Sequence, residues 1–302
     1  MTFFRTNRIL ICILISLTFY YSCTSESNLK EKKPIEITQS RFIHTSFFSK
    51  TLNRDWNYTI YLPPSYFKSK SSKFEILYLL HGHGGNENAW MAENDLRNSI
   101  DSLITTDQLK EFIIAMPDGG NSWYVNGVEP IEDAFINDFM SEINSNYRIH
   151  NGFSHQTIGG MSAGGYGSLR LILKYPDQFQ NAILMSPAAY TPTPDLNSFA
   201  RFDVPSFKNA KNEFSDSIWK SYNYPNYWTL FDKSKQHHLF YLSTGTSDCY
   251  KGIIQAVNKT LPSELSKRKK KVTFSIANYE GGHEMKVWKQ ALLDALKIIY
   301  KK

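Results

Sequence analysis

The sequence predicts an α/β fold in which a mostly parallel β-sheet is covered by helices on both faces. Short, continuously apolar segments alternate with amphipathic segments through most of the chain, which is the pattern of repeated strand–helix–strand units. Several of the apolar segments end in glycine-rich turns, as buried central strands do. The composition agrees, because 41% hydrophobic and 21% charged residues among 302 are typical of a globular protein with a substantial core.

The first 22 residues predict an export signal. Arg5 and Arg8 precede an almost continuously apolar segment, residues 9–21. Such a segment is too short to cross a bilayer as a helix, but it matches the apolar core of a signal peptide. Ser22 and Cys23 then follow as in a bacterial lipoprotein signal, so we expect Cys23 to be lipidated. Ordinary cleavage nearby and a retained signal anchor are the alternatives.

The expected organisation is a signal peptide over residues 1–22, a polar tether over residues 23–34 and one folded domain over residues 35–302. The protein would then be exported and held in the bacterial envelope, in the periplasm or at the cell surface, with the lipid as its only membrane attachment. A net charge of +6 without a basic recognition motif does not indicate a nucleic-acid partner. Three cysteines, two of them near the export signal, exclude a disulfide framework and a cysteine-based metal site.

The strands are predicted from apolar and alternating segments. Residues 35–62 alternate loosely, contain many β-formers and end at two prolines, which predicts two or three antiparallel strands. Continuous apolar runs predict buried strands at residues 74–80 and 112–117. A short strand that ends in a glycine-rich turn is predicted at residues 156–161, two more buried strands at residues 181–186 and 238–244, and the last strand at residues 272–278. Helical periodicity predicts helices at residues 131–146, 164–175, 250–266 and 284–300.

Residues 187–230 interrupt this alternation. The segment holds five of the twelve prolines and ten aromatic side chains. It is too long for an ordinary connection and too aromatic for a linker, so we expect a cap-like insert that forms a lid or a binding surface over the functional site. A set of short helices that pack on the main core is the alternative.

The clearest chemical motif is Gly160-Met161-Ser162-Ala163-Gly164, between a predicted strand and a predicted helix. A serine in this context lies on a tight turn that needs small residues two positions to either side. The turn raises the hydroxyl above the edge of the sheet and places it at the N-terminus of the helix, where backbone N–H groups are free. The motif therefore predicts Ser162 as a nucleophile.

A nucleophilic serine needs a base, and the base needs an acid that orients it. His283 follows the predicted strand 272–278, and Asp248 follows the predicted strand 238–244. Both positions lie at the carboxyl edge of the sheet, where ligands and catalytic groups collect. We therefore expect His283 as the base and Asp248 as the acid. Asp232 and Glu280 are rival acids, but neither has the Gly-x-x-Asp pattern that follows a strand at Asp248.

A second glycine-rich loop, from His81 to Gly85, follows the predicted strand 74–80. Acyl transfer passes through an oxyanion that preorganised backbone N–H groups stabilise. We expect the N–H groups of His83 and Ala163 to be these donors, and His81 to be a structural residue under the loop. A His-x-His pair with no third ligand nearby does not indicate a metal ion, and no metal or organic cofactor is expected.

These motifs occur in an order that resembles the esterase D-like family of α/β-hydrolases, which includes feruloyl and acetyl-xylan esterases, S-formylglutathione hydrolases and the antigen 85 mycolyltransferases. The matching stretches are YTIYLPPSY, FEILYLLHGHGG with NENAW, MPDGGNSWY, IGGMSAGGYGSLRLILKYPDQF, STGTSD and EGGHEMKVW. The resemblance implies an α/β-hydrolase fold and a serine esterase that works through an acyl-enzyme. It also implies that Asn121, Trp123 and Tyr124 line the substrate pocket, although the two rings are alternatively core residues.

The expected substrate is a small ester or a glycan that carries acetyl or hydroxycinnamoyl groups, an expectation that depends on the resemblance and on the export signal. An acyltransferase of the antigen 85 type is the nearest alternative. A non-catalytic glycan-binding protein at the cell surface, which would use the aromatic residues 187–230, is a further one. A cytoplasmic S-formylglutathione hydrolase conflicts with the export signal.

Overall fold

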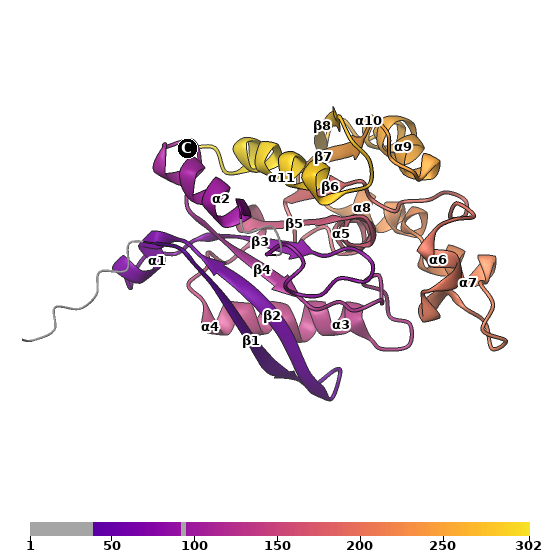
Figure 1. Ribbon diagram of the computed structural model, residues 1–302, viewed down its shortest axis with the longest axis horizontal. Coiled ribbons are helices and arrows are strands. Elements are labelled where there is room, and N and C mark those ends of the chain that lie inside the picture. Colours follow the sequence, from indigo (N-terminus) through magenta and orange to yellow (C-terminus); the bar gives the residue numbers. More distant parts are fainter. Residues whose placement is uncertain (1–38, 92–94) are drawn as a thin grey trace, which may run out of the picture. The chain divides into compact units, whose positions relative to one another are not determined.

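The computed structural model describes residues 39–91 and 95–302, and these belong to one compact unit. The described part contains a sheet of eight strands in the order β1-β2-β4-β3-β5-β6-β7-β8 (Figure 1). The strands are β1 (Arg41–Ser49), β2 (Arg54–Leu62), β3 (Glu75–Leu80), β4 (Phe112–Pro117), β5 (Gln156–Met161), β6 (Asn181–Met185), β7 (His238–Gly245) and β8 (Val272–Tyr279). Strands β3 to β8 are parallel, whereas β2 pairs antiparallel with both β1 and β4. The prediction of a mostly parallel sheet is confirmed.

Helices connect most of the strands. They are α1 (Pro64–Lys68), α2 (Asp95–Thr105), α3 (Ile131–Ala134), α4 (Met140–Asn146), α5 (Ala163–Lys174), α6 (Phe199–Phe202), α7 (Asp216–Tyr222), α8 (Trp228–Lys233), α9 (Lys251–Gln255), α10 (Leu261–Ser266) and α11 (Met285–Ile299). A π-helical turn at Phe135–Phe139 joins α3 to α4, and another at Ala256–Thr260 joins α9 to α10. The helices predicted at residues 131–146 and 250–266 are therefore confirmed in extent, each with a π-helical turn inside it.

Both faces of the sheet are buried at its centre, which explains why a central strand such as β3 is almost continuously apolar. In β3, Ile76 and Tyr78 belong to a core with α5, whereas Leu77 and Leu79 belong to a second core with α2 and α11. Successive side chains of a strand point to opposite faces, so a strand covered on both sides needs an apolar residue at every position. Figure 1 shows α2 and α11 on one side of the sheet and α3 and α4 on the other.

Helix α2 was not among the predicted elements. It buries only Leu96 and Ile100 fully, with Leu103 and Ile104 partly buried beside them. The rest of its sequence is polar, so its apolar stripe is narrow. The predicted signal peptide, the tether and Cys23 lie outside the described residues. Within the described residues, no helix is long and apolar enough to cross a membrane.

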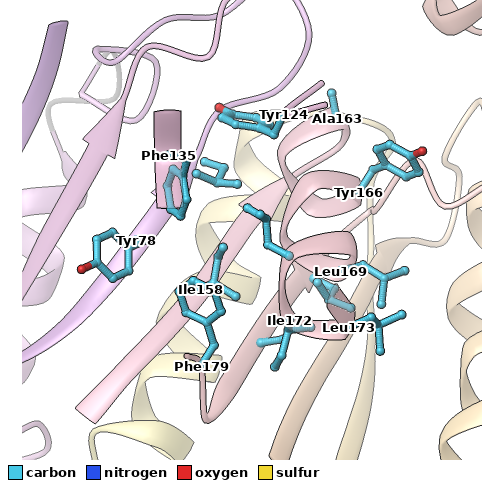
Figure 2. Close-up of a cluster of buried hydrophobic side chains, with 14 of the residues drawn as sticks. Tyr78, Tyr124, Phe135, Ile158, Ala163, Tyr166, Leu169, Ile172, Leu173 and Phe179 are labelled. Carbon is cyan, nitrogen blue, oxygen red and sulfur yellow. The ribbon is translucent and has the colours of Figure 1, made fainter. Parts of the chain in front are cut away.

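The aromatic segment of residues 187–230 divides into two parts. Its C-terminal part packs on the core, because Trp219 is fully buried and stacks on Tyr166 of α5 with ring centroids 5.2 Å apart. Figure 2 shows Tyr166 near the N-terminal end of α5, among the buried side chains of that helix. In contrast, Phe199 and Phe202 of α6 remain 43% and 52% exposed. The alternative of short packed helices thus describes α7 and its surroundings but not α6.

A buried arginine anchors this insert to the main fold. Arg170 of α5 donates from Nε to the carbonyl oxygen of Tyr222 at 2.6 Å and from Nη2 to the hydroxyl of Tyr227 at 3.1 Å. It also pairs with Glu132 at 2.8 Å, and both side chains are 1% exposed. The carbonyl oxygen of Tyr124 accepts a further hydrogen bond, from Nη1, at 3.0 Å. One guanidinium group therefore holds the insert, helix α3 and the loop that contains Tyr124 together.

Candidate active site

Ser162 lies on the sharp turn between β5 and α5. Its φ of 52° and ψ of −114° are unusual for a residue with a side chain, and such strain is typical of functional turns. A Cβ atom on Gly164 would lie 2.5 Å from the carbonyl oxygen of His81, and one on Gly160 would lie 2.5 Å from the backbone of Gly164. Only glycine fits at these two positions, which explains why both flank the serine.

The structure brings Ser162, His283 and Asp248 together in one hydrogen-bonded chain. The Nε2 atom of His283 lies 2.8 Å from Oγ of Ser162, and its Nδ1 atom lies 2.8 Å from Oδ2 of Asp248. A carboxylate only accepts hydrogen bonds, so Nδ1 carries the proton and Nε2 is free to accept the serine proton. The carboxylate of Asp248 is fully buried, whereas the side chain of His283 is 13% exposed. Nε2 of His283 therefore faces the serine hydroxyl as a hydrogen-bond acceptor.

Backbone contacts hold the loops of Asp248 and His283 against each other. The loops follow the neighbouring parallel strands β7 and β8. The backbone N–H of Ser247 donates to the carbonyl oxygen of Gly281 at 2.9 Å. A Cβ atom on Gly245 would lie 2.4 Å from the carbonyl oxygen of Gly282, so this approach requires a glycine. The distance between the acid and the base is thus set by the backbone.

The two rival acids have different surroundings. Asp232 accepts hydrogen bonds from Arg268 at 2.7 and 3.0 Å. Glu280 is exposed. In contrast, Asp248 accepts the backbone N–H of Tyr250 at Oδ1, at 3.0 Å, while Oδ2 faces the imidazole. The geometry therefore places Asp248 as the partner of His283.

Two aromatic rings that the sequence analysis did not single out flank His283. Tyr250 lies 4.9 Å from the imidazole, with the ring planes at 81°, and Trp288 lies 4.8 Å away, with the planes at 87°. Both rings line the same pocket as Ser162. Tyr250 follows the acid by two positions, and Trp288 belongs to the EGGHEMKVW stretch. Their closeness to the motifs is the signal that could have identified them.

The loop from His81 to Gly85 passes close to the serine, since a Cβ atom on Gly82 would lie 3.4 Å from Cβ of Ser162. The imidazole of buried His81 accepts the backbone N–H of Gly119 at Nε2, at 2.8 Å, and its Nδ1 lies 2.7 Å from the carbonyl oxygen of Gly82. The side-chain oxygen of Asn121 accepts the backbone N–H of Gly84 at 2.8 Å. Hydrogen bonds with the loop of residues 118–124 thus support the glycine-rich loop.

The two predicted oxyanion donors, His83 and Ala163, belong to the two segments that come close together at Gly82 and Ser162. Ala163 is the first residue of α5, so its backbone N–H has no partner within the helix. His83 lies within the tight turn that the hydrogen bond from Gly85 N–H to Gly82 O closes, at 3.2 Å. The structure therefore brings both predicted donors to the same edge of the sheet as Ser162.

Ser162 opens into a pocket of about 140 Å³ with mainly aromatic walls. The pocket is lined by Gly82, His83, Gly85, Trp123, Met161, Ser162, Tyr190, Ser198, Phe199, Tyr250, His283 and Trp288. Three of these, Tyr190, Ser198 and Phe199, come from residues 187–230, so the insert contributes to the pocket. Within residues 39–91 and 95–302, no cluster of three or more metal-ligating side chains is present.

Of the three residues expected to line the pocket, only Trp123 does so, which corrects the prediction for the other two. Tyr124 is 1% exposed and packs against Gly167, and its hydroxyl accepts the backbone N–H of His81 at 3.0 Å. Figure 2 shows its ring beside the N-terminal end of α5, near Ala163. Asn121 supports the glycine-rich loop through Gly84 and lines a neighbouring hollow instead.

Comparison with known proteins finds esterases among the relatives of this chain. An acetyl esterase from Caldicellulosiruptor saccharolyticus is 26% identical over 83% of this chain and 95% of its own length. An endo-1,4-beta-xylanase/feruloyl esterase from Xylanibacter ruminicola is 26% identical over 52% of this chain, but the match spans only 23% of that longer protein.

Solved structures show the same fold. A ferulic acid esterase superposes with a TM-score of 0.71 at 22% identity, covering 87% of this chain and 98% of its own. An S-formylglutathione hydrolase from Staphylococcus aureus superposes with a TM-score of 0.65 at 19% identity, covering 87% and 100%. The family model described as "putative esterase" matches residues 49–299. The chain therefore belongs to this esterase family and has the α/β-hydrolase fold.

Proposed function

We propose that this protein is a serine carboxylic-ester hydrolase. The observation that carries the proposal is the chain of two 2.8 Å contacts from Ser162 through His283 to the buried carboxylate of Asp248, at the mouth of an aromatic pocket. Ester hydrolysis needs a nucleophile, a base and an acid that orients the base. Each of these three roles has one side chain here.

In the proposed reaction, Oγ of Ser162 attacks the ester carbonyl while Nε2 of His283 takes its proton. The backbone N–H groups of His83 and Ala163 stabilise the oxyanion of the tetrahedral intermediate. Asp248 stabilises the imidazolium that forms, and the imidazolium then protonates the leaving alcohol. Water repeats the cycle on the acyl-enzyme, with His283 as its base, and releases the acid and the free serine.

For the substrate we propose acetyl or hydroxycinnamoyl esters of glycans, or small esters. The acetyl esterase from Caldicellulosiruptor saccharolyticus, which this chain matches over 95% of that protein's length, supports the acetyl group. The pocket volume of about 140 Å³ supports it too, because pockets that enclose drug-sized ligands typically measure about 300–1,000 Å³. The rings of Trp123, Phe199 and Tyr250 suit a planar hydroxycinnamoyl group, part of which would extend out of so small a pocket.

The test is hydrolysis of a panel of esters by the purified protein, with Ser162→Ala as the control. The panel contains p-nitrophenyl acetate, butyrate and octanoate, methyl ferulate and acetylated xylan. We expect turnover that Ser162→Ala abolishes, with acetate faster than octanoate. A folded protein that hydrolyses none of these esters contradicts the proposal.

We also propose that the protein is exported and carries a lipid on Cys23. The support is the sequence of residues 1–23 alone, with its basic start, apolar core and following cysteine. The test is partition of the cell-expressed protein between aqueous and detergent phases. We expect the wild type in the detergent phase and Cys23→Ser in the aqueous phase. Identical partition of the two proteins contradicts lipidation.

A further inference from the structure

The insert helix α6 encloses the side chain of His83, whose backbone N–H is one of the two proposed oxyanion donors. The imidazole stacks on Phe199 with ring centroids 4.5 Å apart and planes 19° apart. Its Nε2 atom lies 2.9 Å from Oδ2 of Asp203, the residue that ends α6. Its Nδ1 atom lies 3.2 Å from the indole nitrogen of Trp123. The side chain of His83 is only 9% exposed as a result.

These contacts select one tautomer of the ring. An indole N–H only donates, so Nδ1 of His83 must be the acceptor for Trp123. The proton of the neutral ring then lies on Nε2, where it donates to the carboxylate of Asp203. Both ring nitrogens are therefore satisfied, and the imidazole is held on three sides by groups from the insert and from the loop of residues 118–124.

The backbone around His83 has little rigidity of its own. Gly82 and Gly84 flank it, and Gly84 has a φ of 71°. Glycines allow many backbone conformations, whereas an oxyanion donor must point at a fixed position before the reaction begins. Asn121 and His81 support the neighbouring residues, but the side chain of His83 is the direct link between the donor residue and the insert.

We propose that Phe199 and Asp203 are positioning residues that hold His83, and with it the oxyanion donor, in place. This inference rests on the proposed esterase function, because it assigns these residues a role in that reaction. It gives the insert a part in stabilising the transition state besides lining the pocket. Asp203 is 59% exposed, so its hydrogen bond with the imidazole contributes little by itself, and the stacked Phe199 and the Trp123 hydrogen bond also hold His83.

The experiment compares the wild type with Asp203→Ala, Phe199→Ala and their combination. Asp203→Asn is the conservative variant, because its amide oxygen can still accept a hydrogen bond from the Nε2–H group of His83. Leu196→Ala is the matched control, since Leu196 lies in the same insert and is 85% exposed. Each protein is measured in two ways: kcat and KM for p-nitrophenyl acetate, and hydrogen exchange of the backbone amides of residues 81–86.

We expect the combined variant to lose about tenfold in kcat, less than the roughly 10²–10³-fold cost of removing an oxyanion donor. KM should change by less than about twofold, because the donor acts on the transition state more than on the bound ester. Exchange should become faster in residues 81–86 and remain unchanged in the strands of the sheet. Asp203→Asn and Leu196→Ala should resemble the wild type in both measurements.

Unchanged exchange in the combined variant overturns the inference, and this readout needs no substrate. It therefore decides whether α6 holds the loop even if the wild type shows no Ser162-dependent turnover, a result that would contradict only the esterase proposal. Faster exchange with an unchanged kcat overturns the positioning role. A raised KM with an unchanged kcat also overturns it, because that result describes a simple pocket wall.

Discussion

The Nε2 atom of His283 lies 2.8 Å from Oγ of Ser162, although 121 positions separate the two residues in the chain. The sheet order explains this closeness. Ser162 follows β5 and His283 follows β8, and β6 and β7 lie between these two parallel strands. All four strands end at the same edge, so the loops that follow them meet there. The site therefore depends on the register of the sheet as much as on the three side chains.

Replacing the acid should remove most of the activity without unfolding the protein. In Asp248→Asn the amide has nearly the same shape, but it no longer stabilises the imidazolium or fixes the tautomer of His283. We expect kcat for p-nitrophenyl acetate to fall by about 10³–10⁴-fold at pH 7. The matched control is Glu280→Gln, which removes a neighbouring exposed carboxylate. Equal losses in the two variants would show that Asp248 has no special role.

Gly164, two positions after the serine, should be required for the turn between β5 and α5 to fold. A Cβ atom in Gly164→Ala would lie 2.5 Å from the carbonyl oxygen of His81 and 2.6 Å from that of Leu80. Backbone atoms cannot move aside cheaply, so we expect the free energy of unfolding to fall by about 3 kcal/mol. Urea denaturation followed by circular dichroism measures this.

Gly282→Ala is the control for that substitution. Its Cβ atom would meet nothing closer than the carbonyl oxygen of Ser247, at 3.6 Å. We expect a loss below about 1 kcal/mol, which is typical of substitutions without a packing conflict. If Gly164→Ala is as stable as Gly282→Ala, the close contact at the turn between β5 and α5 does not exist in solution.

A buried histidine far from the site should make stability depend on pH. His238 is fully buried among the rings of Phe153 and Phe231. Among the described residues, nothing pairs with its Nε2 atom. Burial lowers the pKa of His238 from 6.5 to about 4. Between these two values the unfolded chain binds a proton that the folded protein does not, so stability is complete above pH 6.5 and falls as the pH drops towards 4.

The variant His238→Asn isolates this effect, because its amide can still donate to the carbonyl oxygen of Phe179, as Nδ1 does at 3.1 Å. Urea denaturation of both proteins at several pH values gives the difference in unfolding free energy. We expect the wild type to lose about 3 kcal/mol relative to the variant between pH 7 and 4, at about 1.4 kcal/mol for each pKa unit. Parallel pH curves would contradict the lowered pKa.

Breaking the buried ion pair under the insert should destabilise the fold. In Glu132→Gln, Arg170 loses the carboxylate that faces it at 2.8 Å, while both side chains stay buried. We expect a loss of about 3–5 kcal/mol, because the charge of the arginine is left uncompensated. Glu129→Gln is the control, since its pair with Arg54 is 42–47% exposed and such pairs contribute about 0–1 kcal/mol. Similar losses in both variants would contradict this account.

The sequence predicted those parts of the molecule that depend on local sequence patterns. The order of most strands and helices follows from apolar periodicity, and Ser162, Asp248 and His283 each follow a strand in a glycine-containing loop. The structure brings all three together as expected.

The burial of Tyr124 in the core could not be predicted from a local sequence pattern. A ring in a loop has the same local pattern whether it faces a pocket or the core. Its burial depends on Gly167 and on the backbone of His81, both distant in the sequence. The contact between His83 and Asp203 spans 120 positions and is equally invisible to local patterns.

The most direct test of the central claim is labelling with a fluorophosphonate, which reacts with a serine only when a base activates it and oxyanion donors stabilise the adduct. The site of labelling is read by peptide mass spectrometry of the full chain. We predict one modified residue, Ser162, no labelling of Ser162→Ala, and labelling of His283→Ala that is slower by about 10³-fold or more. An unlabelled wild type, or a label on another residue, would contradict the account.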